Sequence, residues 1–185
     1  MARKSQRRMT EKPEDCILET ERLWLCRMDP ERDFRQFSET MADADTMRFI
    51  GGAPMSEPQA WRSMATIIGH WDIRGYGFMS CIAKDGSGHV GRIGPWYPHG
   101  WPDREVGWTL HPAFQGMGYA TEAGRACIDY AFGELGWNRV IHVIQHGNHA
   151  SANVARKLGS THIGEVDGIP AVTEEACWIY GQDKP

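Results

Sequence analysis

Apolar and polar residues alternate along several short segments in the first half of the chain, which is typical of β-strands. In segment 19–28, Leu23 and Leu25 fall on one face and the residues between them fall on the other. Segments 77–84 and 89–96 predict two further strands, and the Asp-Gly-Ser-Gly sequence between them predicts a hairpin turn. This part of the chain therefore predicts antiparallel pairing.

Helical periodicity separates the first strand from this hairpin. Segment 31–43 predicts one helix, and a Gly-Gly-Ala-Pro loop at 51–54 follows it. Ser56 is a suitable N-cap for a second helix, with Pro58 in its first turn. The apolar positions of this helix recur at intervals of three and four residues: Trp61, Met64, Ile67, Ile68 and Trp71. They predict one buried face.

The clearest alternation of the chain lies at 104–110 and predicts a strand with one apolar and one polar face. The apolar face holds Val106, Trp108 and Leu110, and the other holds Glu105, Gly107 and Thr109. The sequence QGMGYA at 115–120 then leads into a helix that ends before Gly136. The apolar positions of this helix are Ala120, Ala123, Cys127, Ile128, Ala131 and Leu135.

The last part of the chain predicts three more strands and a short helix. The strands lie at 138–145, 161–166 and 175–181, and Asn148 or His149 caps the helix between the first two. Hairpins come early, and a strand–helix–strand–helix–strand series comes late. This order predicts an α/β fold, with a mixed sheet of antiparallel and parallel pairs and helices on both faces.

Length and composition limit the class of protein. A chain of 185 residues with 41% hydrophobic and 24% charged residues fits one folded domain, which we place at 16–185. No apolar stretch approaches the roughly 18 residues of a membrane span, and the N-terminus lacks the apolar core of a signal peptide. Five scattered cysteines without a CxxC pair favour a reduced, cytoplasmic protein.

Residues 1–15 form a predicted disordered, basic N-terminal arm. Residues 1–12 carry a net charge of +4, whereas the whole chain carries −4. The acidic body argues against nucleic-acid binding, and we expect neither nucleic acid nor membrane as a partner. The simplest interpretation of the arm is a solvated tail. Contact with nucleic acid or membrane, or packing across a homodimer, stays open.

The glycine turn before the predicted helix at 119–135 is a candidate anion site. Gly116 and Gly118 let the backbone turn so that free N–H groups at the helix start point outward, where the helix dipole adds positive charge. Thr121 stands where the dinucleotide fingerprint GxGxxG needs a small residue. The Lys-Ser/Thr pair of a Walker motif is also missing. A purely structural turn remains the alternative.

The sequence QGMGYA fits the pattern Q/R-x-x-G-x-G/A and resembles the acetyl-CoA signature of the GCN5-related N-acetyltransferases, the GNAT superfamily. The flanking residues and the downstream NHASANVARKLG look like the RimJ/RimL-like branch, which acetylates ribosomal-protein N-termini. The resemblance runs from about Leu18 to Tyr180 and is specific over 104–159. It implies an acetyl-CoA-dependent N-acetyltransferase that acts on a protein N-terminus or a small amine by direct attack in a ternary complex.

The resemblance also implies where acetyl-CoA binds. The cofactor would lie between two splayed parallel strands at 104–110 and 139–145. The pyrophosphate would meet the backbone of the turn, which consists of Gln115, Gly116, Met117, Gly118, Tyr119 and Ala120. A backbone N–H near Leu110 or His111 would serve the carbonyl oxygen of the thioester.

Glu105 is the candidate general base. The attacking amine must lose a proton, and an acidic residue on this strand, beside the small Gly107, is suitably placed to accept it directly or through water. The family likeness also places an acidic residue near the acceptor. The alternative is a structural carboxylate that pairs with Arg92 or Arg104.

Asn148 and Ser151 match the N-x-x-S motif of the family. The resemblance implies that Asn148 holds the pantetheine arm and that Ser151 lies near the thiol sulfur. Ordinary helix capping is the alternative for both. Many N-terminal acetyltransferases place a tyrosine general acid four residues after this serine, where this chain has Ala155. Either Ser151 or water then takes that role, or no dedicated acid exists.

The remaining candidates concern the acceptor and a metal. Trp96, Tyr97 and Trp101 crowd a Pro- and Gly-rich loop before the candidate base and are expected to wall the acceptor pocket, with structural packing as the alternative. No metal is expected, because the histidines at 142, 146 and 149 lack patterned partners. A CoA-binding domain without activity and a nucleotide-dependent oxidoreductase are the competing functions, and Thr121 disfavours the second.

Overall fold

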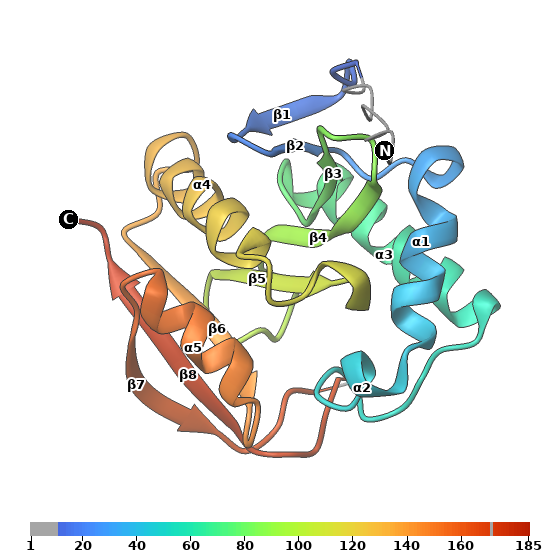
Figure 1. Ribbon diagram of the computed structural model, residues 1–185. Coiled ribbons are helices and arrows are strands. Elements are labelled where there is room, and N and C mark those ends of the chain that lie inside the picture. The colour runs from blue at the N-terminus through green and yellow to red at the C-terminus, as the bar shows by residue number, and fades with distance from the viewer. Residues whose placement is uncertain (1–10, 171) are drawn as a thin grey trace, which may run out of the picture.

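One mixed sheet runs through the computed structural model, which describes residues 11–170 and 172–185 (Figure 1). Its strand order is β1-β2-β3-β4-β5-β6-β8-β7. The strands are β1 Cys16–Glu19, β2 Leu23–Cys26, β3 Met79–Ala83, β4 Gly88–Trp96, β5 Glu105–Leu110, β6 Arg139–Gln145, β7 Thr161–Val166 and β8 Cys177–Asp183. The helices are α1 Pro30–Ala42, α2 Ala44–Met47, α3 Glu57–Arg74, α4 Tyr119–Gly133 and α5 His149–Lys157, with a 3₁₀ turn at Pro112–Phe114.

The only parallel neighbours among the described strands are β5 and β6, and they barely pair. A single register pair, Glu105 with Ile141, joins them, whereas β4 and β5 pair along their whole length. The two strands therefore diverge beyond Glu105. The hydrogen bonds between β4 and β5 show which way the backbone of β5 faces: the His111 N–H donates to the Val90 carbonyl at 2.9 Å. Because successive N–H groups of an antiparallel strand point to opposite sides, the Leu110 N–H points away from β4, into the gap between β5 and β6.

Helices cover both faces of the sheet, as the sequence predicts. On one face, Val106 and Ile93 pack against Ala123 and Cys127 of α4, and all four side chains are buried. On the other face, α1 and α3 build a second apolar cluster that includes Phe78. Figure 1 shows α4 and the pair α1 and α3 on opposite sides of β4. The predicted α/β fold with a mixed sheet is confirmed.

Two details of the sequence prediction are wrong in this fold. Within segment 19–28 only Leu23–Cys26 is a continuous strand, because a turn separates it from β1, which ends at Glu19. The Thr20 hydroxyl closes this turn by accepting the Leu23 N–H at 3.1 Å. Trp61 does not join the buried face of α3 but is 51% exposed. Its ring packs edge-on against Phe34 of α1, which gives an aromatic side chain a partner at the surface.

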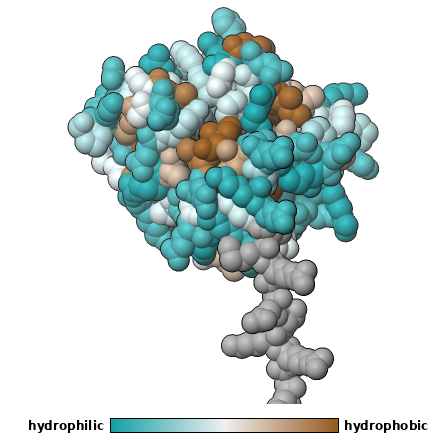
Figure 2. All heavy atoms as spheres, turned by 90° about the horizontal axis from the view of Figure 1, so that it is seen from above, coloured by the Kyte–Doolittle hydropathy of each residue, from teal (hydrophilic) through white to brown (hydrophobic). Residues whose placement is uncertain are grey.

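The predicted basic arm lies mostly outside the described residues, so its disorder stays a prediction. Asp15, at the end of that segment, pairs with Arg32 at 2.8 Å. No described helix combines the length and the apolar character needed to cross a bilayer. Figure 2 shows a mainly hydrophilic face with separate hydrophobic patches, and the large exposed apolar side chains, such as Ile73 and Ile163, lie on different elements.

Candidate active site

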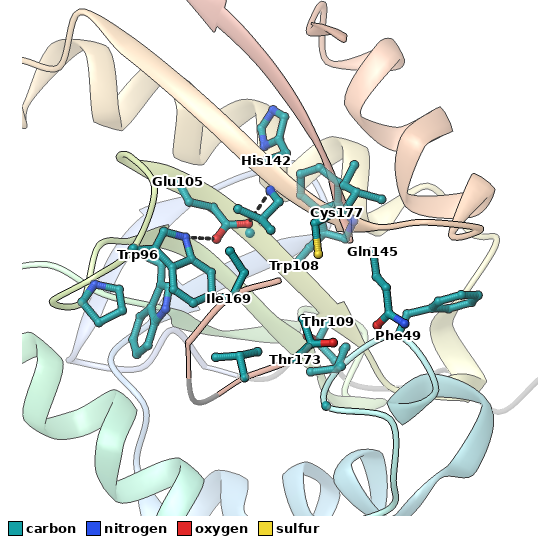
Figure 3. A pocket seen from close by; sticks show the side chains of 18 of the residues that line it. Phe49, Trp96, Glu105, Trp108, Thr109, His142, Gln145, Ile169, Thr173 and Cys177 are labelled. Atoms are coloured by element: carbon teal, nitrogen blue, oxygen red, sulfur yellow. Dashed lines mark hydrogen bonds between the residues drawn. The ribbon is translucent and has the colours of Figure 1, made fainter. Parts of the chain in front are cut away.

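An aromatic cavity of about 490 Å³ lies on the α1/α3 side of β4 and β5. The polar face of β5 supplies Glu105, Gly107 and Thr109, as the alternation predicts. The aromatic lining consists of Phe49, Phe78, Trp96, Trp101 and Trp108. Figure 3 shows Ile169 and Thr173, from the segment between β7 and β8, reaching across the same space. The cavity is thus lined by residues from distant parts of the chain.

A second hollow of about 360 Å³, here called the turn cleft, lies beside the glycine turn. Its lining includes the predicted residues Leu110, Gln115, Gly116, Gly118 and Ala120. Gly118 is the N-cap of α4 with φ 84°, and Gly116 has φ 74°, so both use the left-handed region that favours glycine. The helix start and its dipole therefore face a cleft large enough for a ligand, which supports an anion site.

The two hollows meet where β5 and β6 diverge. Six residues line both of them: Phe49, Ile50, Trp108, Thr109, Asn148 and Ser151. A ligand that follows the turn cleft can therefore reach a second ligand in the aromatic cavity. This junction is the point at which a group could pass from one ligand to the other.

Glu105 lines the aromatic cavity but not the turn cleft, and it is buried, with 5% of its surface exposed. Its Oε2 accepts the Trp101 indole N–H at 2.7 Å, and its Oε1 accepts the Val143 backbone N–H at 3.1 Å (Figure 3). Burial raises the pKa of Glu105 to about 7, although both hydrogen bonds and the nearby Arg92 lower it in part. No ion pair joins it to Arg92 or Arg104 in the described structure. A carboxyl with this pKa can accept a proton at neutral pH.

Asn148 and Ser151 begin α5 at the junction. The Asn148 side chain accepts the Ser151 backbone N–H at 3.1 Å, so it caps the helix as the structural alternative proposes. Both residues also line the two hollows, so the cap and a ligand contact are compatible. Ala155 is fully buried, and no tyrosine is found among the described residues that line either hollow.

Several predicted site residues lie elsewhere. The lining of the turn cleft does not include His111, Met117 or Tyr119: the His111 N–H is engaged by Val90, the Met117 side chain is 53% exposed, and the Tyr119 ring packs in the core. The structure therefore leaves the Leu110 N–H, not that of His111, free to face the gap. The expected contacts of Met117 and Tyr119 involve their backbone N–H groups and stay a prediction. Tyr97 lines neither hollow, and its ring lies beneath Arg74. Trp96 and Trp101 do line the aromatic cavity.

A family model decides the relationship of this chain to known proteins. The model described as the acetyltransferase (GNAT) domain matches residues 22–161. The chain belongs to this family. The N-acetyltransferase YnaD of Bacillus subtilis, described as uncharacterized, is 29% identical over 133 residues, which cover 72% of this chain and 76% of YnaD.

Solved structures of other GNAT acetyltransferases share the fold. The acetyltransferase of Agrobacterium tumefaciens superposes with a TM-score of 0.76 at 27% identity, covering 95% of this chain and 99% of its own. RimL, a ribosomal L7/L12 α-N-protein acetyltransferase solved with coenzyme A, superposes with a TM-score of 0.74, covering 91% and 97%. At 16% identity, the likeness of this GNAT chain to RimL concerns the fold alone.

Sequence reasoning missed the charged residues around the turn cleft of this acetyltransferase. Arg48 and Lys157 line the cleft and offer cations to a phosphorylated ligand. Lys157 continues the three-residue spacing of Asn148, Ser151 and Val154, so the helix phase could have revealed it. Arg48 follows the short helix α2, and no local pattern marks it.

Arg22 clamps the glycine turn from the β1–β2 hairpin. Its Nε donates to Glu122 of α4 at 2.6 Å, and its Nη1 donates to the Met117 carbonyl at 3.0 Å. Its guanidinium lies 4.2 Å from the centroid of the Tyr119 ring. These contacts hold residues on both sides of Gly118, so Arg22 fixes the turn although it lies about a hundred residues away in sequence.

The histidines do not build a metal centre. No described group of three or more His, Cys, Asp or Glu side chains has an arrangement that could hold a metal ion. His142 lies 2.6 Å from the Val106 carbonyl oxygen through Nδ1 and 2.9 Å from Ser160 Oγ through Nε2. Because a carbonyl oxygen can only accept, Nδ1 carries the proton and Ser160 donates to Nε2. Burial lowers the pKa of His142 to about 4, so the ring is neutral near pH 7.

Proposed function

We propose that this protein is an acetyl-CoA-dependent N-acetyltransferase that acetylates a primary amine by direct attack in a ternary complex. The observation that carries the proposal is the junction of the two hollows, together with a buried carboxyl with a pKa of about 7 that lines one of them. The turn cleft suits a long phosphorylated ligand, and the aromatic cavity suits the amine. Membership of the GNAT family supports both assignments.

On the amine side, Glu105 serves as the general base. Its two oxygens already accept hydrogen bonds, and a neighbouring water could carry the proton from the amine to it. The removal of this proton makes the amine nucleophilic toward the thioester carbonyl. A base with a pKa near 7 suits this task, because it is largely unprotonated just above neutral pH yet still basic enough to accept the proton.

On the acetyl-CoA side, the chain supplies donors along the cleft. The first turn of α4 and the backbone around Gly116 and Gly118 would bind the pyrophosphate. The Leu110 N–H faces the gap and is suited to the thioester oxygen. Asn148 would hold the pantetheine arm, and Ser151 or a water would protonate the departing thiolate. Lys157 and Arg48 add positive charge for the phosphates.

The acceptor class follows less directly. The motif around 148–159 supports a place near the RimJ/RimL-like branch, which is known for protein N-termini but also includes enzymes for polyamines, amino acids and antibiotics. Small-molecule amines are the other class within the proposed function. The aromatic cavity that would hold the amine is lined in part by Trp96 and Trp101.

Two measurements test the proposal together. Thermal shift should show stabilisation by acetyl-CoA and none by NAD, because only binding to the native state raises the melting temperature. Thiol release from acetyl-CoA should then depend on an added amine from a panel of peptides, amino acids and polyamines. Stabilisation by acetyl-CoA without thiol release for any amine would favour an inactive CoA-binding or partner-binding domain.

A further inference from the structure

Arg92 places a cation in the wall of the aromatic cavity without a carboxylate partner. It extends from β4, its Nε lies 3.4 Å from the Thr109 hydroxyl, and its guanidinium lies 4.6 Å from the centroid of the Phe78 ring. No described Asp or Glu forms an ion pair with it. Burial lowers the pKa of Arg92 to about 10, so the guanidinium stays charged at neutral pH.

Glu105, the one carboxyl group among the described lining residues, attracts Arg92 but forms no ion pair with it. Arg92 and Glu105 are the two residues of Asp, Glu, Lys or Arg type among the described lining residues. Glu105 is partly protonated near pH 7, and both of its oxygens already accept hydrogen bonds from Trp101 and Val143. A charge enclosed by apolar walls is costly unless it is paired. A ligand with an anionic group would provide the missing partner.

The position of Arg92 would place the anionic group of a ligand close to the reacting amine. Arg92 lies opposite Thr109 in the β4–β5 register, and Thr109 lines both hollows. The anion would therefore sit next to the junction, where the amine must meet the thioester. In an α-amino acid a single carbon separates the carboxylate from the amine, so one molecule can satisfy both positions.

The remainder of the cavity is suited to an apolar side chain. Phe78 and Trp96 stack with their ring centroids 4.7 Å apart, and Trp101 completes this wall. Gly107 leaves room for the Phe78 ring in this wall, because a Cβ there would approach the ring to 3.1 Å. A flat, aromatic space next to a cation selects for a ring or a branched chain beside a carboxylate.

We propose that the acceptor is a free α-amino acid with an aromatic or large apolar side chain, and that Arg92 binds its carboxylate. The inference rests on the proposed acetyl transfer and names the substrate class of that site. It separates this chain from an acetyltransferase for protein N-termini, because a peptide has an uncharged amide where the amino acid has its carboxylate. Arg92 is then the residue that determines this specificity.

Matched acceptors test the proposal. Thiol release is measured with L-tryptophan, L-tryptophanamide and tryptamine, which share the ring and the amine but differ in the carboxylate. The expected kcat/KM for L-tryptophan exceeds that for the other two by at least about tenfold, as for the loss of one charge-assisted hydrogen-bonded pair. In Arg92→Gln the ratio of kcat/KM for L-tryptophan to that for the other two amines should fall to near one. In Arg92→Lys the ratio should be intermediate, because lysine keeps the positive charge but cannot bind a carboxylate through two parallel hydrogen bonds.

Controls keep the outcomes distinct. Arg104→Gln removes a neighbouring exposed arginine that lines neither hollow, and the ratio should persist. Calorimetry of N-acetyl-L-tryptophan against N-acetyltryptamine, with CoA present, gives the same comparison without turnover and in the wild-type protein. Equal turnover or equal binding of the matched ligands overturns this inference and leaves the proposed acetyl transfer standing. If acetyl-CoA neither binds nor releases thiol, the proposed function is contradicted. If N-acetyl-L-tryptophan and N-acetyltryptamine then also bind equally, the inference about Arg92 is overturned as well.

Discussion

At the scale of single residues, the burial of one carboxyl sets the expected pH dependence of the reaction. Glu105 is 5% exposed, and desolvation outweighs its two hydrogen bonds and the influence of Arg92, so its pKa rises to about 7. The base form then dominates above pH 7. We expect kcat/KM to rise with pH through an apparent pKa near 7 and to level off above it, unless the amine itself titrates there.

Replacing Glu105 by glutamine tests this role. Glutamine keeps the shape but cannot accept the proton, so kcat should fall by at least a hundredfold, as is typical for the loss of a general base. The acidic limb of the pH profile should disappear or move toward the pKa of the amine. The affinity for acetyl-CoA should hardly change, because Glu105 does not line the turn cleft. Steady-state kinetics with the true acceptor and calorimetry give the two readouts.

The control for this variant is Glu134→Gln, which changes an exposed carboxylate at the end of α4. Its kinetics should match those of the wild type. Near-normal kcat in Glu105→Gln would show that the carboxyl is structural. The amine would then use another base or bind in its neutral form.

A methyl group added at Gly107 should disturb the same carboxyl. A Cβ there would lie 3.2 Å from Glu105 Oε1 and 3.1 Å from the Phe78 ring, while the backbone of Gly107 suits any residue. Gly107→Ala should therefore lower kcat without weakening acetyl-CoA binding. Gly164→Ala, in β7, is the matched control, because nothing lies within 4 Å of its added Cβ. Equal kinetics for the two variants would show that the tight packing beside Glu105 has no catalytic consequence.

At the scale of elements, the glycine turn and α4 act as one anion-binding unit. Gly118→Asp brings a carboxylate and a Cβ into the left-handed N-cap position of α4. Repulsion from the pyrophosphate should lower the affinity for acetyl-CoA by at least tenfold, or about 1.4 kcal/mol. Calorimetry on the folded variant measures the change.

Gly136→Asp provides the control for backbone strain. Gly136 also has a left-handed backbone, with φ 64°, and its added Cβ would meet nothing within 4 Å, but it lies outside the turn cleft. Only Gly118→Asp should lose affinity for acetyl-CoA. An unchanged dissociation constant in folded Gly118→Asp would remove the turn from the list of acetyl-CoA contacts.

Local sequence patterns predict the strand and the glycine turn of this site well, but they do not predict which distant residues complete its lining. The alternation at 104–110 places Glu105 and Thr109 on the face that lines the aromatic cavity, because strand periodicity needs only local sequence. The glycine turn is likewise a local signal. Arg92, Arg22 and Phe49 reach the site through the sheet register and long-range packing, which no segment of the sequence encodes by itself.

The errors at this scale also have local physical causes. Strand periodicity did not reveal the Thr20 hydroxyl bond that turns the chain before Leu23. Trp61 fits the three- and four-residue spacing of apolar positions in α3. The face of α3 that is buried is narrower than the set of apolar positions, so the Trp61 side chain lies at the surface. Tyr97 belongs to the predicted aromatic loop yet turns toward Arg74 instead of the cavity.

At the scale of the whole molecule, buried titratable groups predict how stability varies with pH. Burial lowers the pKa values of His89 and His142 to about 4, below the ordinary 6.5, and raises that of Glu105 to about 7, above 4.5. Between pH 4.5 and 6.5 the unfolded chain therefore binds two more protons on the histidines and one fewer on Glu105. These groups make stability fall with falling pH by about 1.4 kcal/mol per unit.

Glu105→Gln should make this acid destabilisation steeper. Of these three groups, only Glu105 makes the protein more stable as the pH falls, and the variant removes it. The dependence of stability on pH due to the remaining two histidines should therefore approach about twice the wild-type slope. The lowered pKa of His70 acts in the same direction as the two buried histidines. Urea unfolding at a series of pH values measures both slopes. A wild-type stability that is flat or rises toward pH 4.5 contradicts the assignment of neutral buried histidines.

Residues 1–12 should be dispensable for folding and for acetyl-CoA binding. Their composition offers no apolar face, and Lys12 forms an exposed pair with Glu19, which Lys84 also binds. A chain that begins at Pro13 should melt within a few degrees of the full chain and keep its acetyl-CoA affinity. Thermal denaturation and calorimetry decide this. A large loss of stability would show that the arm packs, within the chain or across a homodimer.

The weak pairing of β5 with β6 leaves few backbone hydrogen bonds between the two parts of the sheet. Residues 16–110 build β1 to β5, and residues 139–183 build β6, β8 and β7, with Glu105 and Ile141 as the one register pair between them. The amides of β5 that face the gap should therefore exchange hydrogen with solvent faster than those that face β4. Bound acetyl-CoA should slow this exchange, because it would bridge two strands that share a single register pair.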